Sequence, residues 1–456
     1  MDQNKEHSRL FGKLSPAKLF FRCAVPSMIS MAVTSLYTIA DGIFVGHFIG
    51  AEALAAVNLV MPVIMISFAL ADMVAVGSSV QISIRLGEKQ TEEACRIFSF
   101  SCGIILVIAV FVGLIGYFGA GFLVAALKAE ALVAEMAGEY LKVYAVFSPL
   151  VMCFFAVDNY LRICGRMRYS MWMNVGVSLA NIGLDALFVA GFGWGIWSAA
   201  LASCLCLAVG TGISFYPFLR KKLMLRFTRG SLRLRTVGNI LANGSSEFFS
   251  NITSSVCMVL FNVVLMNLGG YLAVAAFSVV MYVDSIVKSL LFGMSDALQP
   301  AISYNYGAGE KKRVFALEIR VQAAALVISA GAMAGMLLGA DGLSMLFAEK
   351  NDKELIAMSA RAMRLFSLSY LFSWCGIVSS SFFTALNRPA FSLVMATSET
   401  LILPLIGLMV LPGIWGLDGV WLTSLATGVI AAALAGILMG RTVRKVKSES
   451  AGPDPA

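Results

Sequence analysis

The chain has little of what most soluble enzymes depend on. Charged residues make up 13% of its 456 residues, whereas a soluble domain has about a quarter. Its two histidines, His7 and His47, argue against a histidine metal site or a histidine catalytic centre. The nine cysteines form no C-x-x-C pair and fit a role as small apolar packing residues. No P-loop, serine-nucleophile or kinase motif is present, which argues against an enzyme and against ATP-driven transport.

Hydrophobic sequence is what the chain has in abundance. Hydrophobic residues make up 59% of it, with a mean hydropathy of +0.84. A helix needs about 20 apolar residues to cross a bilayer, and a spanning segment in lipid must pair its backbone groups internally, as a helix does. We therefore predict an all-α membrane protein with twelve transmembrane helices. They are expected at residues 16–44, 53–82, 97–122, 139–163, 168–191, 195–217, 238–267, 272–301, 315–339, 359–385, 391–411 and 417–440.

The net charge of +8 comes from basic residues that gather in alternate connections between the spans. The connection at 218–237 alone has seven basic residues and no acidic one. Under the positive-inside rule, this pattern places both termini and the 218–237 connection in the cytoplasm. It predicts a multi-pass protein of the cell membrane (inner or plasma) and gives no reason to expect a nucleic-acid partner.

The second half of the chain repeats the first. Shifted by 220 positions, residues 46–87 align with 266–307 without a gap and share 12 of 42 residues. Six crossings return the chain to its starting side, so the halves should be related by a pseudo-two-fold axis along the membrane normal. Duplicated membrane proteins of this kind are often transporters with a substrate site between the repeats. The expected parts are an N-terminal tail (1–15), an N-lobe (16–217), a basic linker (218–237), a C-lobe (238–440) and a C-terminal tail (441–456).

Polar residues inside the spans of the first half are the strongest candidates for a site, because such groups are costly in a membrane. Asn174, Ser178, Asn181 and Asp185 share one face of the fifth span, and Asp41 lies at a matching depth in the first. A carboxyl group held away from water favours its protonated form, and a neighbouring carboxyl strengthens that preference. We predict a substrate cavity lined by Asn174, Ser178 and Asp41. The alternative is that these groups only form hydrogen bonds between helices.

The second half has its own polar residues within predicted spans. Glu247 and Asn251 lie on one face of the seventh span, and Glu399 lies in the eleventh. Such oxygen ligands could hold Na⁺, although a structural role explains them equally well.

The remaining charged residues in the spans include two candidate ion pairs. Asp158 with Arg162, and Asp284 with Lys288, are spaced to neutralise each other along a helix. Asp72 stands alone in the second span.

Three ordered motifs resemble those of the multidrug and toxic compound extrusion (MATE) family. They are the stretch from Gln299 to Gly309 with the basic residues after it, the segment from Asp41 through Gly50 to Ala56, and the N-x-x-L-D pattern that ends at Asp185. The resemblance covers residues 10–445 and implies twelve helices in two lobes. It also implies cation-coupled export of organic, often cationic, drugs.

Carried over residue by residue, the resemblance places the family's coupling site on Asp41, Asn181 and Asp185, with a sixth-helix hydroxyl at Ser203. An acid found in the C-lobe of part of the family falls on Glu247. The chain departs from the family pattern twice. Ala186 stands where proline is usual, and Ser203 where threonine is common.

The function expected from these features is an antiporter that moves H⁺ or Na⁺ inward and lipophilic, often cationic, compounds outward by alternating access. We expect no cofactor besides the coupling ion, and a monomer whose partners are its substrates and the membrane lipids. The alternative within transport is a lipid-linked oligosaccharide flippase of the same superfamily. Such a protein would favour a basic cavity, whereas most unpaired charges in these spans are acidic. A membrane-embedded enzyme would need clustered ligands or a nucleophile–base pair, which the sequence lacks.

Overall fold

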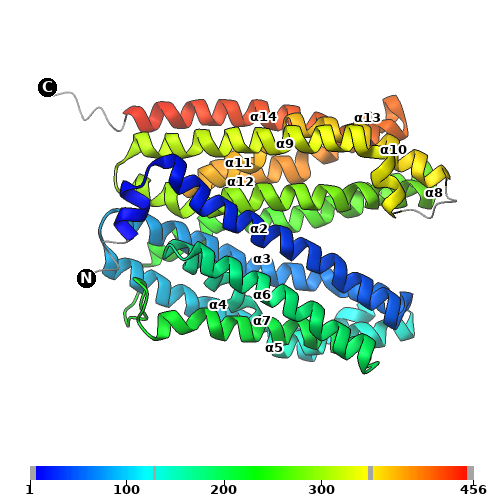
Figure 1. Ribbon diagram of the computed structural model, residues 1–456, viewed down its shortest axis with the longest axis horizontal. Helices are drawn as coiled ribbons and strands as arrows, with labels where there is room; N and C mark the ends of the chain where they lie inside the picture. Colours follow the sequence, from blue (N-terminus) through cyan, green and yellow to red (C-terminus); the bar gives the residue numbers. More distant parts are fainter. Residues whose placement is uncertain (1–6, 127–129, 348–352, 449–456) are drawn as a thin grey trace.

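The computed structural model describes residues 7–126, 130–347 and 353–448, and throughout these ranges the regular elements are helices. The ends of both predicted tails, residues 1–6 and 449–456, lie outside the described residues. The helices run along the long axis of the molecule, and both termini lie at one end of it (Figure 1).

The first lobe follows the predicted spans closely, because each span is a local property of apolar length. Its helices are α2 (Pro16–Phe44), α3 (Ala51–Gly87), α4 (Thr91–Ala126), α5 (Ala131–Ile163), α6 (Met167–Asp185) and α7 (Ile196–Leu219). Several of them extend beyond the predicted ends, since a helix can continue past the hydrocarbon layer.

The second lobe has more breaks. Its helices are α8 (Leu234–Gly307), α9 (Lys311–Phe347), α10 (Lys353–Ser367), α11 (Ser373–Ala385), α12 (Pro389–Thr397), α13 (Leu403–Trp415) and α14 (Leu417–Ser448). A short 3₁₀ turn, η4 (Leu368–Leu371), joins α10 to α11, and the two parts of this span meet at an angle of 44°.

Helix α8 contains two membrane crossings. A straight helix of 74 residues would be about 110 Å long, several times the thickness of a bilayer. The backbone leaves the helical region at Gly270 (φ 62°, ψ −160°). The rings of Phe261 and Phe277, on either side of this break, stack at 5.2 Å, so the two arms lie side by side. Of the described helices, ten are long and apolar enough to cross a membrane. The bent α10–α11 span makes eleven, and the second arm of α8 makes twelve.

Three spans widen into short π-helices. They are η2 (Val45–Ile49) after α2, η3 (Ala186–Gly191) after α6, and η5 (Ser398–Ile402) between α12 and α13. The helix is thus locally irregular directly after Asp185, starting at Ala186, where the family usually has proline. It is also irregular near Asp41 and at Glu399. Single π-helical turns of this kind occur frequently at functional sites.

The two lobes meet through glycines that are equivalent in the repeat. A Cβ on Gly87 would lie 2.1 Å from the carbonyl oxygen of Tyr304, and one on Gly307 would lie 2.2 Å from that of Ile84. A shift of 220 positions turns Gly87 into Gly307 and Ile84 into Tyr304, so each contact is the image of the other. A pseudo-two-fold axis therefore passes between α3 and the second arm of α8.

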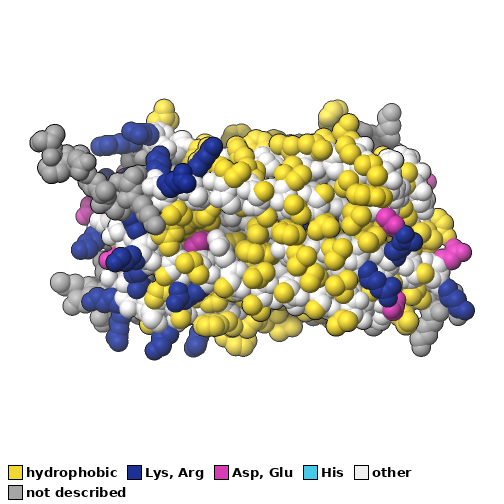
Figure 2. Space-filling view, turned by 90° about the horizontal axis from the view of Figure 1, so that it is seen from above, with side chains coloured by type: hydrophobic (Ala, Val, Ile, Leu, Met, Phe, Trp, Pro, Cys, Tyr) yellow, Lys and Arg dark blue, Asp and Glu magenta, His cyan; other side chains and the backbone are white. Residues whose placement is uncertain are grey.

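The outer surface is that of a membrane protein. Figure 2 shows a broad band of hydrophobic side chains around the middle of the molecule, with charged side chains gathered at its two ends. Lys and Arg are concentrated at the end that holds both termini (Figure 2). We call this the basic end; the 218–237 connection belongs to it. The chain is a multi-pass membrane protein.

The amino-terminal segment, residues 7–15, bridges the two lobes at the basic end. On the first-lobe side, His7 donates a hydrogen bond from Nε2 to the carbonyl of Ile163 at 2.8 Å. On the second-lobe side, Arg313 donates to the carbonyls of Phe11 (3.0 Å) and Leu14 (2.7 Å). The rings of His7 and Phe11 also pack against Tyr304. The predicted tail is therefore, in its described part, a folded element held by both lobes.

Candidate functional site

The structure brings the two predicted first-lobe acids together. The carboxyl groups of Asp41, on α2, and Asp185, at the end of α6, lie within hydrogen-bonding distance of each other. Asp185 is fully buried, and one oxygen of each carboxyl group is buried without a hydrogen-bond partner. Two facing carboxyl groups can form a hydrogen bond only when one of them carries a proton. The arrangement is therefore suited to holding a proton, or a cation in its place.

Neutral oxygens complete this acidic pair. The side-chain amide of Asn181 lies 2.8 Å from Oγ of Ser203, on α7. In the orientation that satisfies all its neighbours, its oxygen accepts from Ser203 and its nitrogen donates to Asp185 at 3.1 Å. The four residues carried over by resemblance thus form one cluster, which we call the first-lobe cluster: Asp41, Asn181, Asp185 and Ser203. Their role in coupling stays a prediction.

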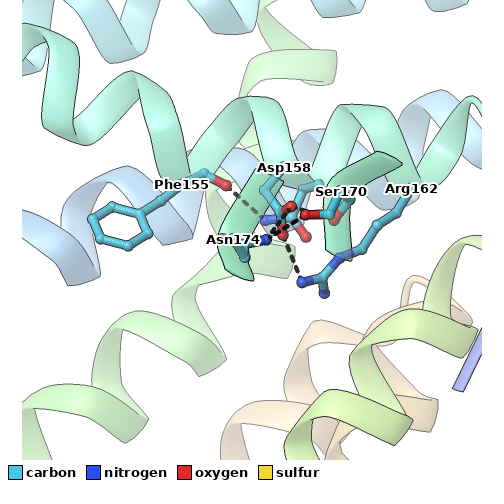
Figure 3. A network of polar contacts seen from close by, with 6 residues as sticks. Phe155, Asp158, Arg162, Ser170 and Asn174 are labelled. Carbon is cyan, nitrogen blue, oxygen red and sulfur yellow. Dashed lines mark hydrogen bonds and ion pairs between the residues drawn. The ribbon is translucent and has the colours of Figure 1, made fainter. Parts of the chain in front are cut away.

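The polar stripe on α6 divides between two networks, the first-lobe cluster and a group around Asp158, which Figure 3 shows. Asn174, expected to line a cavity with Asp41, instead donates to Oδ1 of Asp158 at 2.9 Å. Ser170 also donates to this oxygen, and Arg162 pairs with the other carboxylate oxygen at 2.5 Å. The predicted pair of Asp158 and Arg162 is confirmed. Ser178 is buried between the two networks.

A second group of acids lies where the lobes meet. Asp72 is the lone acid of its span on α3, and in the structure it interacts electrostatically with Asp296 and Glu247, which both lie on α8. These neighbours belong to the other lobe, so the sequence of the second span alone does not reveal them. Arg162 lies close enough to interact with both aspartates, so its positive charge is shared beyond its partner Asp158.

The second lobe contains a partly open cavity of about 250 Å³. Glu247, Asp296, Asp284, Lys288 and Glu399 all contribute to its lining. The predicted pair of Asp284 and Lys288 is confirmed, with a separation of 2.7 Å. The predicted first-lobe cavity residues Asn174, Ser178 and Asp41 are not among the residues that line this space.

The three second-lobe candidates differ in their surroundings. Asn251 donates to the carbonyl of Glu247 in its own helix, at 2.9 Å. Glu247 and Glu399 both face the cavity. In the described part of the chain, no group of three or more His, Cys, Asp or Glu residues has the arrangement to hold a metal ion. Any bound Na⁺ would therefore depend on amide and hydroxyl oxygens as well, as the first-lobe cluster provides.

Two residues of the cavity were missed by the sequence reasoning. Asp296 lies within the predicted eighth span, and an acid in a membrane span was signal enough to single it out. Tyr370 donates to Oδ1 of Asp284 at 2.9 Å, a contact between distant parts of the chain that no local pattern reveals.

An architecture of many membrane-spanning helices in two equivalent lobes, with acidic residues inside the spans of each, is common among transporters. Comparison with known proteins gives the family: residues 26–187 and again 248–409 match the MatE family model. The chain belongs to the MatE family. The two matches also agree with the internal repeat, and the resemblance seen in the sequence is confirmed.

Individual relatives are similar over nearly their whole length. The multidrug export protein MepA of Staphylococcus saprophyticus is 23% identical over 427 residues, which is 93% of either chain. A crystal structure of MATE in complex with MaL6 matches with a TM-score of 0.93, at 24% identity over 97% of this chain and 99% of that one. The outward-facing conformation of a multidrug resistance MATE family transporter matches with a TM-score of 0.91, at 24% identity and the same coverage. The predicted architecture of twelve helices in two six-helix lobes is thus confirmed.

Proposed function

We propose that this protein is a cation-coupled antiporter that exports lipophilic, often cationic, drugs and toxic organic compounds. The name of the staphylococcal relatives, multidrug export protein, supports drug export. The observation that carries the coupling is the facing pair of Asp41 and Asp185 in the first-lobe cluster. A buried pair of this kind changes its net charge when it takes up H⁺ or Na⁺, and so can exchange a cation for a substrate.

The coupling step follows from charge. With a proton or Na⁺ bound, the cluster loses the negative charge that attracts a cationic substrate; without it, the charge returns. One elementary charge crossing a potential of 100 mV supplies about 2.3 kcal/mol. Inward movement of the coupling ion can therefore drive outward movement of the substrate.

The proposed mechanism is alternating access about the pseudo-two-fold axis. In the structure, the close glycine contacts between Gly87 and Tyr304 and between Gly307 and Ile84 hold the lobes together towards the basic end. The basic residues there support a cytoplasmic location for that end, in a protein of the cell membrane. The lobes would part at this end to take up substrate and close again to release it outside. The protein would need no cofactor other than the ion and would work as a monomer.

The test is dye efflux from proteoliposomes that contain the purified protein. Asp41→Asn and Asp185→Asn should each reduce gradient-driven efflux to background, because neither amide can take up and release a proton. Asp341→Asn is the matched control, since Asp341 pairs with Arg364 on the exposed surface. Full activity in both first-lobe variants would remove the proposed coupling site.

The coupling ion needs a separate measurement. Uptake of ²²Na⁺ and acidification of the vesicle interior should be followed in vesicles loaded with substrate. Vesicles without substrate are the comparison. Proton coupling predicts substrate-dependent pH change in sodium-free buffer, and sodium coupling predicts ²²Na⁺ uptake at constant pH. Neither flux responding to substrate would contradict antiport.

A further inference from the structure

Two cavities at the basic end share the amino-terminal segment as one of their walls. Their volumes are about 330 Å³ and about 940 Å³, and His7, Arg9, Leu14 and Met224 line both of them. The other walls of the smaller cavity come from α2, from the α5–α6 connection and from the 218–237 connection. Those of the larger one come from the start of α2, from the α3–α4 connection and from Tyr304 on α8. Both spaces therefore have this form only while the segment is docked.

Basic side chains surround both cavities. The smaller cavity is lined by Arg9, Arg22, Arg166 and Lys222, and the larger one by Arg9, Lys13, Lys18 and Lys89. Among the residues that the structure describes, neither lining includes an acidic side chain. Lys222 lies over the ring of Tyr216, and the other basic residues form no ion pair with a described carboxylate. Their positive charges repel one another, and an anion between them would relieve this repulsion.

The backbone adds to the positive character of these spaces. Ser15, the N-cap of α2, lines the larger cavity, and Arg166, the N-cap of α6, lines the smaller one. Neither side chain caps its helix, and neither helix has an acidic residue in its first turn. The first N–H groups of a helix lack partners within it and carry part of the positive end of its dipole. Arginine and lysine side chains and helix N-termini both favour phosphate as a ligand.

The exposed face of α2 relates the cavities to the lipid. Lys18 and Arg22 are exposed one turn apart, and Val25 and Ile29 continue the same face as exposed apolar residues. The surface thus changes from basic to apolar within about one helical turn, as expected at the border between lipid head groups and acyl chains. Basic pockets between membrane helices at this level suit anionic head groups.

We propose that these cavities bind phosphate groups and that a bound phosphate fixes the amino-terminal segment to the lobes. Its oxygens would lie between Arg9 and Lys13 of the segment and Lys18 and Arg22 of α2. The segment also contacts Ile163 in the first lobe and Arg313 in the second, so the ligand would stabilise the closed basic end. The level of Lys18 and Arg22 favours a lipid head group as the source of the phosphate, and free phosphate is the other source. This binding site goes beyond the proposed export function.

The test is hydrogen exchange of residues 7–14 in the full-length protein, reconstituted in lipid nanodiscs. One sample contains phosphatidylcholine alone, and a second contains phosphatidylcholine and phosphatidylglycerol in equal amounts. A third adds inorganic phosphate to the phosphatidylcholine sample, and sodium chloride matches the ionic strength of all three. Exchange should slow by about tenfold or more where the ligand is present, because a ligand that binds only the docked segment stabilises it. Slowing with phosphatidylglycerol identifies a lipid head group, and slowing with inorganic phosphate identifies a free anion.

Variants separate the cavities from the general charge of this end. Lys18→Gln combined with Arg22→Gln should remove most of the slowing. Arg233→Gln combined with Arg235→Gln is the matched control, because it removes the same charge at exposed positions of the basic end that line neither cavity. The control should slow as the wild type does. Arg166→Gln tests the smaller cavity and should reduce the slowing by about fivefold, the effect of one basic charge on an anionic lipid. Thermal unfolding of each variant shows whether it is folded.

Two results would overturn the proposal. One is equal exchange of residues 7–14 in all three samples of the wild type. The other is an equal loss of the slowing in the Lys18–Arg22 variant and in its control, which would assign the effect to overall charge and not to the cavities. The measurement needs no drug and no ion gradient, so its outcome is independent of the proposed antiport.

Discussion

In the first lobe, Asp41 and Asp185 face each other among amide and hydroxyl groups, whereas the second lobe pairs Asp284 with Lys288 beside an open cavity. The folds of the lobes are equivalent, but their charged groups are not. This difference separates a site suited to a small cation from a site suited to an organic molecule.

The internal repeat makes the difference explicit at individual positions. Subtracting 220 from 284 and 288 gives 64 and 68, and these positions hold Ile64 and Phe68. The contact glycines Gly87 and Gly307, in contrast, fall on each other under the same shift. Duplication thus retained the backbone contacts that join the lobes, while charged side chains were placed in each lobe separately.

The largest expected effect is a separation of transport from binding. Asp41→Asn should reduce gradient-driven efflux to background but leave dye binding in detergent unchanged. Glu399→Gln should instead weaken dye binding itself, by about tenfold in Kd, or about 1.4 kcal/mol. Efflux assays and fluorescence anisotropy of the dye, measured on both variants, test this division. Equal loss of both properties in both variants would show that the lobes share one site.

The symmetry of the lobe contact can be tested next. Gly87→Ala and Gly307→Ala each place a Cβ about 2 Å from a carbonyl oxygen of the other lobe. Overpacking should lower the free energy of unfolding by about 1–3 kcal/mol in each variant. The two losses should be nearly equal if the pseudo-two-fold axis relates the two sites. Gly331→Ala on α9, where a Cβ meets nothing within 4 Å, should instead be neutral or stabilising. Thermal unfolding in detergent measures all three, and a large inequality between the first two would break the equivalence.

A smaller effect is expected where the amino-terminal segment bridges the lobes. Arg313→Gln removes the charged donor to the carbonyls of Phe11 and Leu14, which should weaken docking of the segment by about 1–3 kcal/mol. Hydrogen exchange of residues 7–14 should rise accordingly. Arg320→Gln is the control on the same helix, since the Arg320 side chain donates to the Ala316 carbonyl of its own helix, one turn earlier. Unchanged exchange in Arg313→Gln would show that other contacts hold the segment.

The smallest effect is a pH dependence of the same segment. Burial lowers the pKa of His7 from 6.5 to about 4, partly opposed by its hydrogen bond to Ile163. Its surroundings are the rings of Phe11 and Tyr304, with basic residues around the adjoining spaces: Arg9, Lys13, Lys18, Arg22, Lys89, Arg166 and Lys222.

The sign of the effect follows from the lowered value. The undocked segment binds the proton more readily, so docking is at full strength above pH 6.5 and weakens as pH falls towards 4. Each pH unit in that window changes the docking equilibrium by up to about tenfold. Hydrogen exchange, corrected for its intrinsic pH dependence, should show this loss, and His7→Gln should remove it. An equal pH response in His7→Gln would assign the effect to another group.

Much of the fold could be predicted because apolar length is a local property of sequence. The first span was expected at 16–44 and is found at Pro16–Phe44. The approach of Asp41 to Asp185 could also be predicted. Their two spans run in the same direction, so the positions of the two acids along them indicate a matching depth in the membrane. The neighbours of Asp72 were not, because they depend on how the lobes pack. Nor could the sequence show that Tyr370 and Lys288 share one carboxylate, a contact across the bundle.

The amino-terminal segment, residues 7–15, contacts both lobes, and this has a practical consequence. Any rearrangement that separates the lobes at the basic end must break the contact of this segment with Ile163 or with Arg313. Release of the segment from one lobe therefore accompanies separation of the lobes. A fluorophore attached near residue 8, read against one at the end of α14, would therefore report each opening directly. Bulky fusions are better placed after α14, because an extension at the amino terminus would join the segment that bridges the two lobes.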